Sequence, residues 1–149
     1  MSKLLLDQLA ATNMVYGRFS FQYFLDSMQH LGVRNIELYG CSTHFHFYDS
    51  VNPVPRLKKQ IRDSGLRVIS VMPEENLYPV NIAARENRLR DNTILLYKKF
   101  MEAAAELDCH QMLLCPGRPY RDMPYSEGYK YSKDSVEQLV EYAKEVDVV

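Results

Sequence analysis

Short segments rich in β-branched and apolar residues alternate along the chain with longer segments in which apolar residues recur every three or four positions. The first pattern is typical of buried strands and the second of amphipathic helices. The predicted strands span residues 9–16, 33–39, 66–72 and 111–115, and a fifth begins at 146–149. The predicted helices begin after an N-cap at Ser20, at residue 54, near Ala83 and, beyond a loop at 116–127, around Val136; Gly32 and Gly65 end the first two.

This alternation predicts an α/β fold with a parallel sheet. No hairpin signal joins two strands, so each connection crosses over through a helix, and such βαβ units are right-handed. The turns from helix to strand are short and the loops after the second, third and fourth strands are long, as in a TIM (β/α)8 barrel. A closed barrel needs about 250 residues. Residues 1–149 therefore predict one partial barrel domain, roughly four βα units and the start of strand five, with an open doubly wound sheet as the alternative.

A polar loop follows the third predicted strand, which stops at Pro73. Polar side chains just past the carboxyl end of a parallel strand are where α/β proteins usually bind ligands. We therefore expect this loop to border a site, and a solvated connection is the alternative. Its polar residues are Glu74, Glu75, Asn76, Tyr78 and Asn81.

Composition narrows the class of protein. A hydrophobic content of 46%, a charged content of 25% and a net charge of −1 are ordinary for a soluble domain and give no electrostatic footprint for nucleic acid. Asp7 interrupts the apolar run of residues 4–6, and nothing approaches the length of a membrane span. The odd cysteine count without metal or redox spacing favours a reducing, cytoplasmic setting. We expect Cys41, Cys109 and Cys115 all to be buried.

Three further positions are candidates for a pocket. Glu37 lies near the end of a buried strand, where a carboxylate either faces a wet cavity or pairs with a cation such as Arg67. His44 and His46 have the spacing of two metal ligands, but no third ligand is nearby, so a role in loop packing or substrate contact is favoured. Gly117 would let the backbone approach a ligand, and turn chemistry explains it equally well. Cys115 has no positioned base, which argues against a cysteine hydrolase.

Three motifs carry a resemblance to a known family: Asn35-Ile-Glu-Leu-Tyr-Gly40, Pro73-Glu74 and Tyr78-Pro79-x-Asn81. They resemble the xylose-isomerase-like sugar phosphate isomerases and epimerases, most closely the fructoselysine 3-epimerase branch. The resemblance runs from about Asn13 to Val149 and covers the amino-terminal half of that family's barrel. It implies an enzyme that uses a divalent metal (Mn, Mg, Co or Zn) and a pair of glutamates to move a proton next to a sugar carbonyl.

In that family the metal ligands and the catalytic glutamates come from the second half of the barrel. The resemblance therefore implies that this chain supplies substrate contacts, that it holds no metal ligand or catalytic base, and that it is inactive alone. The expected partners are a sugar or sugar phosphate and a second copy of the chain. The expected substrate-binding residues are Glu37, His44, Glu74, Tyr78, Asn81 and Gly117.

Other functions stay open. Two uncovered strand edges could close an inactive half-barrel into a dimer, and the loops could bind a sugar without chemistry. A cluster in the fourth loop could stack on or bind a sugar phosphate, although a solvated loop is the favoured interpretation. Endonuclease IV, which shares the family fold, has metal-binding histidines where this chain has Pro73-Glu74 and Cys115-Pro116, which argues against DNA repair. The cluster consists of Tyr120, Tyr125, Tyr129 and Tyr131 with Arg118 and Arg121.

Overall fold

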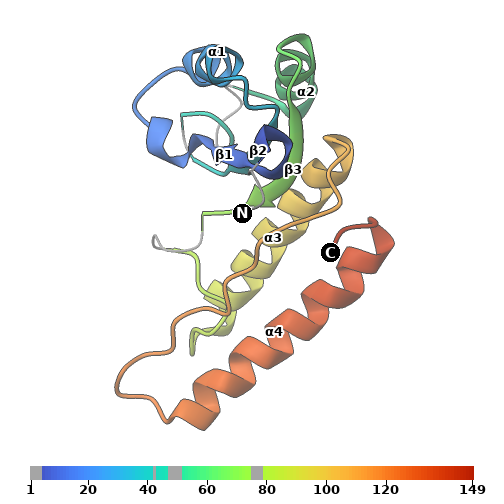
Figure 1. Ribbon diagram of the computed structural model, residues 1–149. Helices are drawn as coiled ribbons and strands as arrows, with labels where there is room; N and C mark the ends of the chain where they lie inside the picture. The colour runs from blue at the N-terminus through green and yellow to red at the C-terminus, as the bar shows by residue number, and fades with distance from the viewer. Residues whose placement is uncertain (1–4, 42, 47–51, 75–78) are drawn as a thin grey trace.

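A computed structural model describes residues 5–41, 43–46, 52–74 and 79–149 (Figure 1). Strands and helices alternate as the sequence predicts. The strands are β1 (Ala10–Thr12), β2 (Asn35–Tyr39) and β3 (Arg67–Met72). The helices are α1 (Phe21–Leu31), α2 (Val54–Asp63), α3 (Asn87–Glu106) and α4 (Tyr125–Glu145), and the short 3-10 helices η1 (Leu6–Gln8) and η2 (Asn13–Tyr16) flank β1.

The three strands form a parallel sheet in the order β1-β2-β3. The predicted fourth strand is reduced to a parallel bridge between Val71 and Met112, in which the amide of Val71 donates to the carbonyl of Gln111 over 2.9 Å. Val149 continues the sheet, because its amide donates to the carbonyl of His110 (2.9 Å) and its carbonyl accepts from Met112 (2.8 Å). The parallel arrangement thus agrees with the sequence prediction. Val146 and Asp147 form a turn at the end of α4, so the start of a fifth strand at 146–149 stays a prediction.

Local signals explain the ends of several elements. The hydroxyl of Ser20 accepts a hydrogen bond from the amide of Tyr23 (3.2 Å) at the start of α1, and Gly32 ends this helix in the left-handed region, as the sequence predicts. The prediction that the third helix begins near Ala83 is wrong, because Asn81 caps a turn at 81–83 and α3 begins only at Asn87.

Helix α4 begins at Tyr125, earlier than the apolar pattern around Val136 suggests. Its first turns carry Tyr125, Tyr129 and Tyr131, so the prediction of a loop for these residues is wrong, whereas Tyr125 and Tyr129 are exposed as predicted. The sequence hides this start because the first turns lack an apolar stripe. Helices α3 and α4 run side by side in the same direction, as successive helices of βα repeats do (Figure 1).

The core lies between the sheet and the helices. Fully buried aliphatic and aromatic side chains come from α1, β2, β3 and α3, and each contributes about 1.5–3 kcal/mol of burial free energy. Gly40 lets β2 end close to this core, since a Cβ there would lie 2.5 Å from Phe100 Cζ. Cys109 is buried as predicted, whereas Cys41 and Cys115 are half-buried. Helices of the described residues are all too short or too polar to cross a membrane.

Candidate functional site

A polar row crosses the sheet near the carboxyl ends of its strands. The strand register places Thr12 beside Glu37 and Glu37 beside Ser70. Successive residues of a strand point to opposite faces, and Ile36 and Leu38 are buried in the core beneath the helices. The half-buried Glu37 therefore lies on the other face of the sheet, with a hydroxyl residue on each side. The register thus brings a carboxylate and two hydroxyl residues together, and the Thr12 hydroxyl also accepts from the Met14 amide over 3.3 Å as the N-cap of η2.

The structure bears on one of the two alternatives left open for Glu37, the ion pair with Arg67. Arg67 donates from Nε to Asn35 Oδ1 over 2.6 Å, and an ion pair between Arg67 and Glu37 is absent from the described part of the chain. A role of Glu37 in a pocket stays a prediction. Glu74 is half-buried directly after β3, and its predicted role is untested. Tyr78 lies outside the described residues.

Asn13 joins the end of β1 to the end of β2. This side chain is fully buried, and its Oδ1 accepts a hydrogen bond from the Tyr39 amide (2.6 Å) while its Nδ2 donates to the Tyr39 carbonyl (3.0 Å). The amide group thus continues the strand pairing after the backbone turns into η2. The prediction that the first strand extends to residue 16 is wrong, because β1 ends at Thr12, whose hydroxyl caps η2 by accepting from the Met14 amide. Nδ2 also lies 2.9 Å from Nδ1 of His44.

His44 links the loop after β2 to the loop after β1. Only 1% of the residue is exposed, and its Nε2 lies 2.8 Å from the carbonyl oxygen of Phe19. The Thr43 hydroxyl supports the same link by donating to the Gly17 carbonyl over 3.0 Å. Both ring nitrogens of His44 therefore have protein partners, which favours the loop-packing role among those predicted from the sequence.

Cys41 stands at the edge of this cluster. Its Sγ is 3.5 Å from Thr43 Oγ1 and 3.8 Å from Asn13 Nδ2. Burial raises the pKa of the Cys41 thiol, but its interactions with His44 and Thr43 together lower it by more, so the pKa lies below its ordinary value. Burial dominates at Cys109 and raises the pKa of that thiol.

Asn81 holds the loop after β3 against the loop after residue 115. Its Nδ2 donates to the carbonyl of Arg118 (2.8 Å), and its Oδ1 accepts from the amides of Arg118 and Ala83 (3.0 Å each). Gly117 makes this approach possible, since its φ is +83° and a Cβ there would lie 2.7 Å from the Ala83 amide nitrogen. Asn81 and Gly117, both predicted to contact substrate, are thus brought together to position two loops; direct substrate contact stays a prediction.

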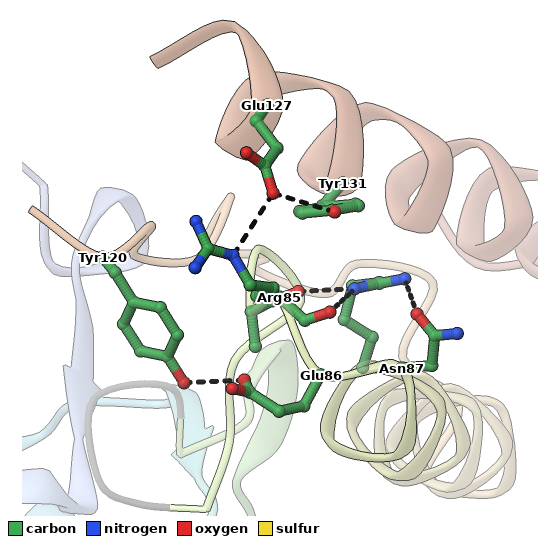
Figure 2. A network of polar contacts seen from close by, with 8 residues as sticks. Arg85, Glu86, Asn87, Tyr120, Glu127 and Tyr131 are labelled. Atoms are coloured by element: carbon green, nitrogen blue, oxygen red, sulfur yellow. Dashed lines mark hydrogen bonds and ion pairs between the residues drawn. The ribbon is translucent and has the colours of Figure 1, made fainter. Parts of the chain in front are cut away.

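The same two loops are joined by a network at the first turns of α3 and α4 (Figure 2). Tyr120 donates to Glu86 over 2.7 Å, and this hydrogen bond lowers the pKa of the Glu86 carboxyl. Glu127 accepts from Arg85 (3.3 Å) and from Tyr131 (3.0 Å), and the second bond raises the pKa of Tyr131. Tyr120 thus bonds to the residue just before α3, whereas Tyr131 bonds within α4. Contact of either tyrosine with a sugar phosphate stays an untested alternative.

Sequence reasoning missed several of these positioning residues. Asn13 falls inside a predicted strand, and nothing in the local pattern marks it as a clamp. Arg85, Glu86 and Glu127 lie in or beside helical segments where charged residues are usually solvated. Their roles depend on contacts between loops that are far apart in the sequence, so a local pattern carries no signal for them.

A metal site is not formed by the described residues: they contain no group of three or more histidine, cysteine, aspartate or glutamate side chains placed to hold an ion. His44, the nearest candidate, has both ring nitrogens engaged with Asn13 and Phe19. The described residues alone therefore do not provide a ligand set for the divalent metal that the resemblance implies.

Several solved structures similar to this chain are sugar epimerases by title. A D-tagatose 3-epimerase-like protein superposes with a TM-score of 0.77 at 18% identity, over 93% of this chain and 49% of that chain. An L-ribulose 3-epimerase gives 0.74 at 18% identity, over 95% and 47%. A 3-keto-D-glucoside 4-epimerase from E. coli gives 0.71 at 17% identity, over 94% and 53%. The chain thus spans about half the length of the structures it matches.

A search of curated proteins finds no match to this chain. The family model described as "Xylose isomerase-like TIM barrel" matches residues 25–149, which is most of the sequence. The parallel βα repeats of the structure agree with that match. The chain belongs to the xylose isomerase-like TIM barrel family.

Proposed function

We propose that this chain is the amino-terminal, substrate-binding half of a sugar epimerase or isomerase that transfers a proton at a carbon next to a carbonyl. The observation that carries the proposal is the row of Thr12, Glu37 and Ser70 on the sheet face away from the helices, bordered by interlocked loops. TIM barrels bind their substrates at this end of the strands. The similar structures named above are titled as 3- and 4-epimerases of sugars, which supports the substrate class.

The proposed roles follow from the chemistry of a sugar. The Glu37 carboxylate accepts hydrogen bonds from substrate hydroxyls, and the hydroxyls of Thr12 and Ser70 can donate or accept. Glu74, half-buried after β3, would extend the polar surface, and Tyr78 stays a predicted substrate contact. The loops held by Asn13, His44 and Asn81 orient the sugar, because a reaction next to a carbonyl needs the hydroxyl and carbonyl oxygens in fixed positions.

Proton transfer itself requires groups that this half does not supply. A divalent metal, if the complete enzyme binds one, would supply Lewis acidity at the carbonyl oxygen, and glutamates on either side of the substrate would act as acid and base. We propose that these groups come from residues outside the 149 of this chain. The chain alone would then bind sugar without turning it over.

Epimerase activity tests this proposal. The native protein that carries this sequence is incubated with a ketohexose, with and without EDTA, and the epimers are separated by chromatography. We expect epimerisation that EDTA abolishes, and no turnover by the purified 149-residue chain. Activity that survives complete chelation would contradict the metal mechanism, and activity of the chain alone would contradict the division of roles.

A second candidate is an inactive half-barrel that pairs with another copy. An apolar groove of about 420 Å³ lies between α3, α4 and the segment around Met112, and it includes Met101, Leu139 and Val148. Leu5, Leu6 and Leu31 are more than half exposed. Surfaces of this kind tend to be covered by a partner. Light scattering tests this candidate, since a monodisperse monomer at high concentration would rule it out.

A third candidate is a binding module without chemistry. The polar row and loops would then bind a sugar or sugar phosphate in the absence of metal. The native protein separates this candidate from the enzyme: a binding module binds fructose 6-phosphate in EDTA and shows no epimerisation when metal is restored, whereas the enzyme proposal requires metal-dependent epimerisation.

A further inference from the structure

Two buried polar side chains, Asn13 and His44, connect three segments that border the proposed substrate side. They are 0% and 1% exposed, whereas His30 on α1 is exposed. A buried imidazole or amide is costly unless its polar atoms are paired. The contacts of this pair therefore determine which loop conformation is stable.

The hydrogen bonds fix the tautomer of His44. Asn13 Oδ1 accepts from the Tyr39 amide, so the atom that faces the imidazole is Nδ2, which can only donate. Nδ1 of His44 must then carry a lone pair. Nε2 faces the carbonyl oxygen of Phe19, which can only accept, so Nε2 carries the proton. The geometry defines a neutral imidazole protonated on Nε2.

The hydrogen bonds form a series that leads from Tyr39 through Asn13 and His44 to Phe19. The carbonyl and amide of Tyr39 orient Asn13, Asn13 orients His44, and His44 holds the Phe19 carbonyl just before α1. On the other side, Asn52 donates from Nδ2 to the His44 carbonyl over 3.1 Å. One histidine thus joins three segments: residues 13–20, residues 43–46 and the residues just before α2.

We propose that Asn13 and neutral His44 are a positioning pair that holds the loops after β1 and β2 in the substrate-binding arrangement, and that His44 acts through these loops and not by touching the sugar. This inference rests on the proposed function for its biological meaning. Its structural content, the tautomer and the coupling of the loops, holds for the chain by itself.

Two substitutions of His44 separate the hydrogen bonds from the packing. In His44→Gln the amide oxygen can accept from Asn13 and the amide nitrogen can donate to Phe19, at nearly the spacing of the two ring nitrogens. His44→Leu fills the space but leaves Asn13 Nδ2 and the Phe19 carbonyl without their partner. His30→Leu, which changes an exposed histidine, is the matched control.

Amide hydrogen exchange of the purified chain measures how well the loops are protected from opening. We expect His44→Leu to raise the exchange rates of residues 17–19 and 43–46 by about tenfold or more, and β3 to exchange as in the parent chain. His44→Gln is expected to restore most of the protection, and His30→Leu to change nothing. Unchanged loop exchange in His44→Leu, or an equal rise throughout the chain, would overturn the proposal.

Nitrogen NMR of ¹⁵N-histidine-labelled chain at about pH 8, above the ordinary pKa of histidine, reports the tautomer. We expect Nδ1 of His44 to be unprotonated and Nε2 to be protonated. In Asn13→Asp the carboxylate faces Nδ1, so both ring nitrogens should be protonated at the pH of the measurement. Cys41 is the nearest other titratable group. Protonated Nδ1 in the parent chain would overturn the proposal.

Binding of D-fructose, followed by NMR, links the pair to function. If the parent chain binds, His44→Leu should weaken binding by about tenfold or more and His44→Gln should not; equal binding by both variants would overturn the substrate role. If the parent chain binds no sugar, the proposed function loses its main support, and the exchange and tautomer results still decide whether the pair holds the loops.

Discussion

Gly117 and Asn81 show how single side chains determine the shape of the candidate site. The sequence marks both as substrate contacts, because they follow strands in a chain whose motifs resemble sugar epimerases. The structure adds a positioning role that the motifs do not contain: Asn81 makes hydrogen bonds to the backbone of Arg118, and only a glycine at position 117 leaves room for this contact.

Replacing Gly117 by alanine should destabilise the fold. The residue has φ +83°, and the added Cβ would lie 2.7 Å from the Ala83 amide nitrogen, so we expect a loss of at least about 2 kcal/mol in the free energy of unfolding, measured with urea. Gly65→Ala is the matched control: its φ is +69° but no atom lies within 4 Å, so only about 1 kcal/mol should be lost. Equal losses would contradict the close approach at Gly117.

The Cys41 thiol should react faster with an alkylating reagent than the Cys109 thiol. Its pKa is lowered and its side chain is half-buried, whereas the pKa of Cys109 is raised and that residue is buried. Because the thiolate is the reactive form, iodoacetamide near neutral pH should modify Cys41 first, and the rate should rise at lower pH than for Cys109. Peptide mass spectrometry measures both rates; faster modification of Cys109 would contradict the assignment.

Helix α4 illustrates what the sequence predicts about an element and what it misses. Periodicity correctly indicates a helix after the fourth loop, but its first turns contain exposed tyrosines and Gly128 and show no apolar stripe. The structure explains these turns by contacts between distant segments. Gly128 packs so closely on Pro119 that a Cβ would collide with it. The Ser135 hydroxyl can donate to the Ile82 carbonyl (2.9 Å), and it also lies 2.8 Å from the Tyr131 carbonyl of its own helix. Such contacts leave no periodic signal.

The hydrogen bond from Ser135 should stabilise the docking of α4 on the loop after β3. Ser135 is 1% exposed and buries the Ile82 carbonyl with it, so Ser135→Ala should cost about 1–3 kcal/mol in the free energy of unfolding. Ser126→Ala, at an exposed position of the same helix, should cost less than about 0.5 kcal/mol. Urea unfolding of both variants measures the difference, and equal stability would exclude this docking contact.

For the chain as a whole, the alternation of strands and helices is sufficient to predict the parallel sheet, and with the motifs it indicates the family. Apolar periodicity is set by burial on a sheet or helix, and it survives even where boundaries shift by several residues. The candidate site is predicted less completely. Glu37 stands out in the sequence because a carboxylate on a buried strand is unusual, whereas Thr12 and Ser70 beside it become visible only through the strand register.

The central claim is that this half of the barrel positions a sugar for proton transfer next to its carbonyl. The most direct test is to incubate the native protein that carries this sequence with a ketohexose in D₂O and to measure deuterium at the carbon next to the carbonyl by mass spectrometry and NMR. We expect deuterium in the epimerised product and at least about tenfold slower incorporation in Glu37→Gln. Epimerisation without deuterium incorporation, or no exchange at all with any ketohexose or its phosphate, would contradict the account.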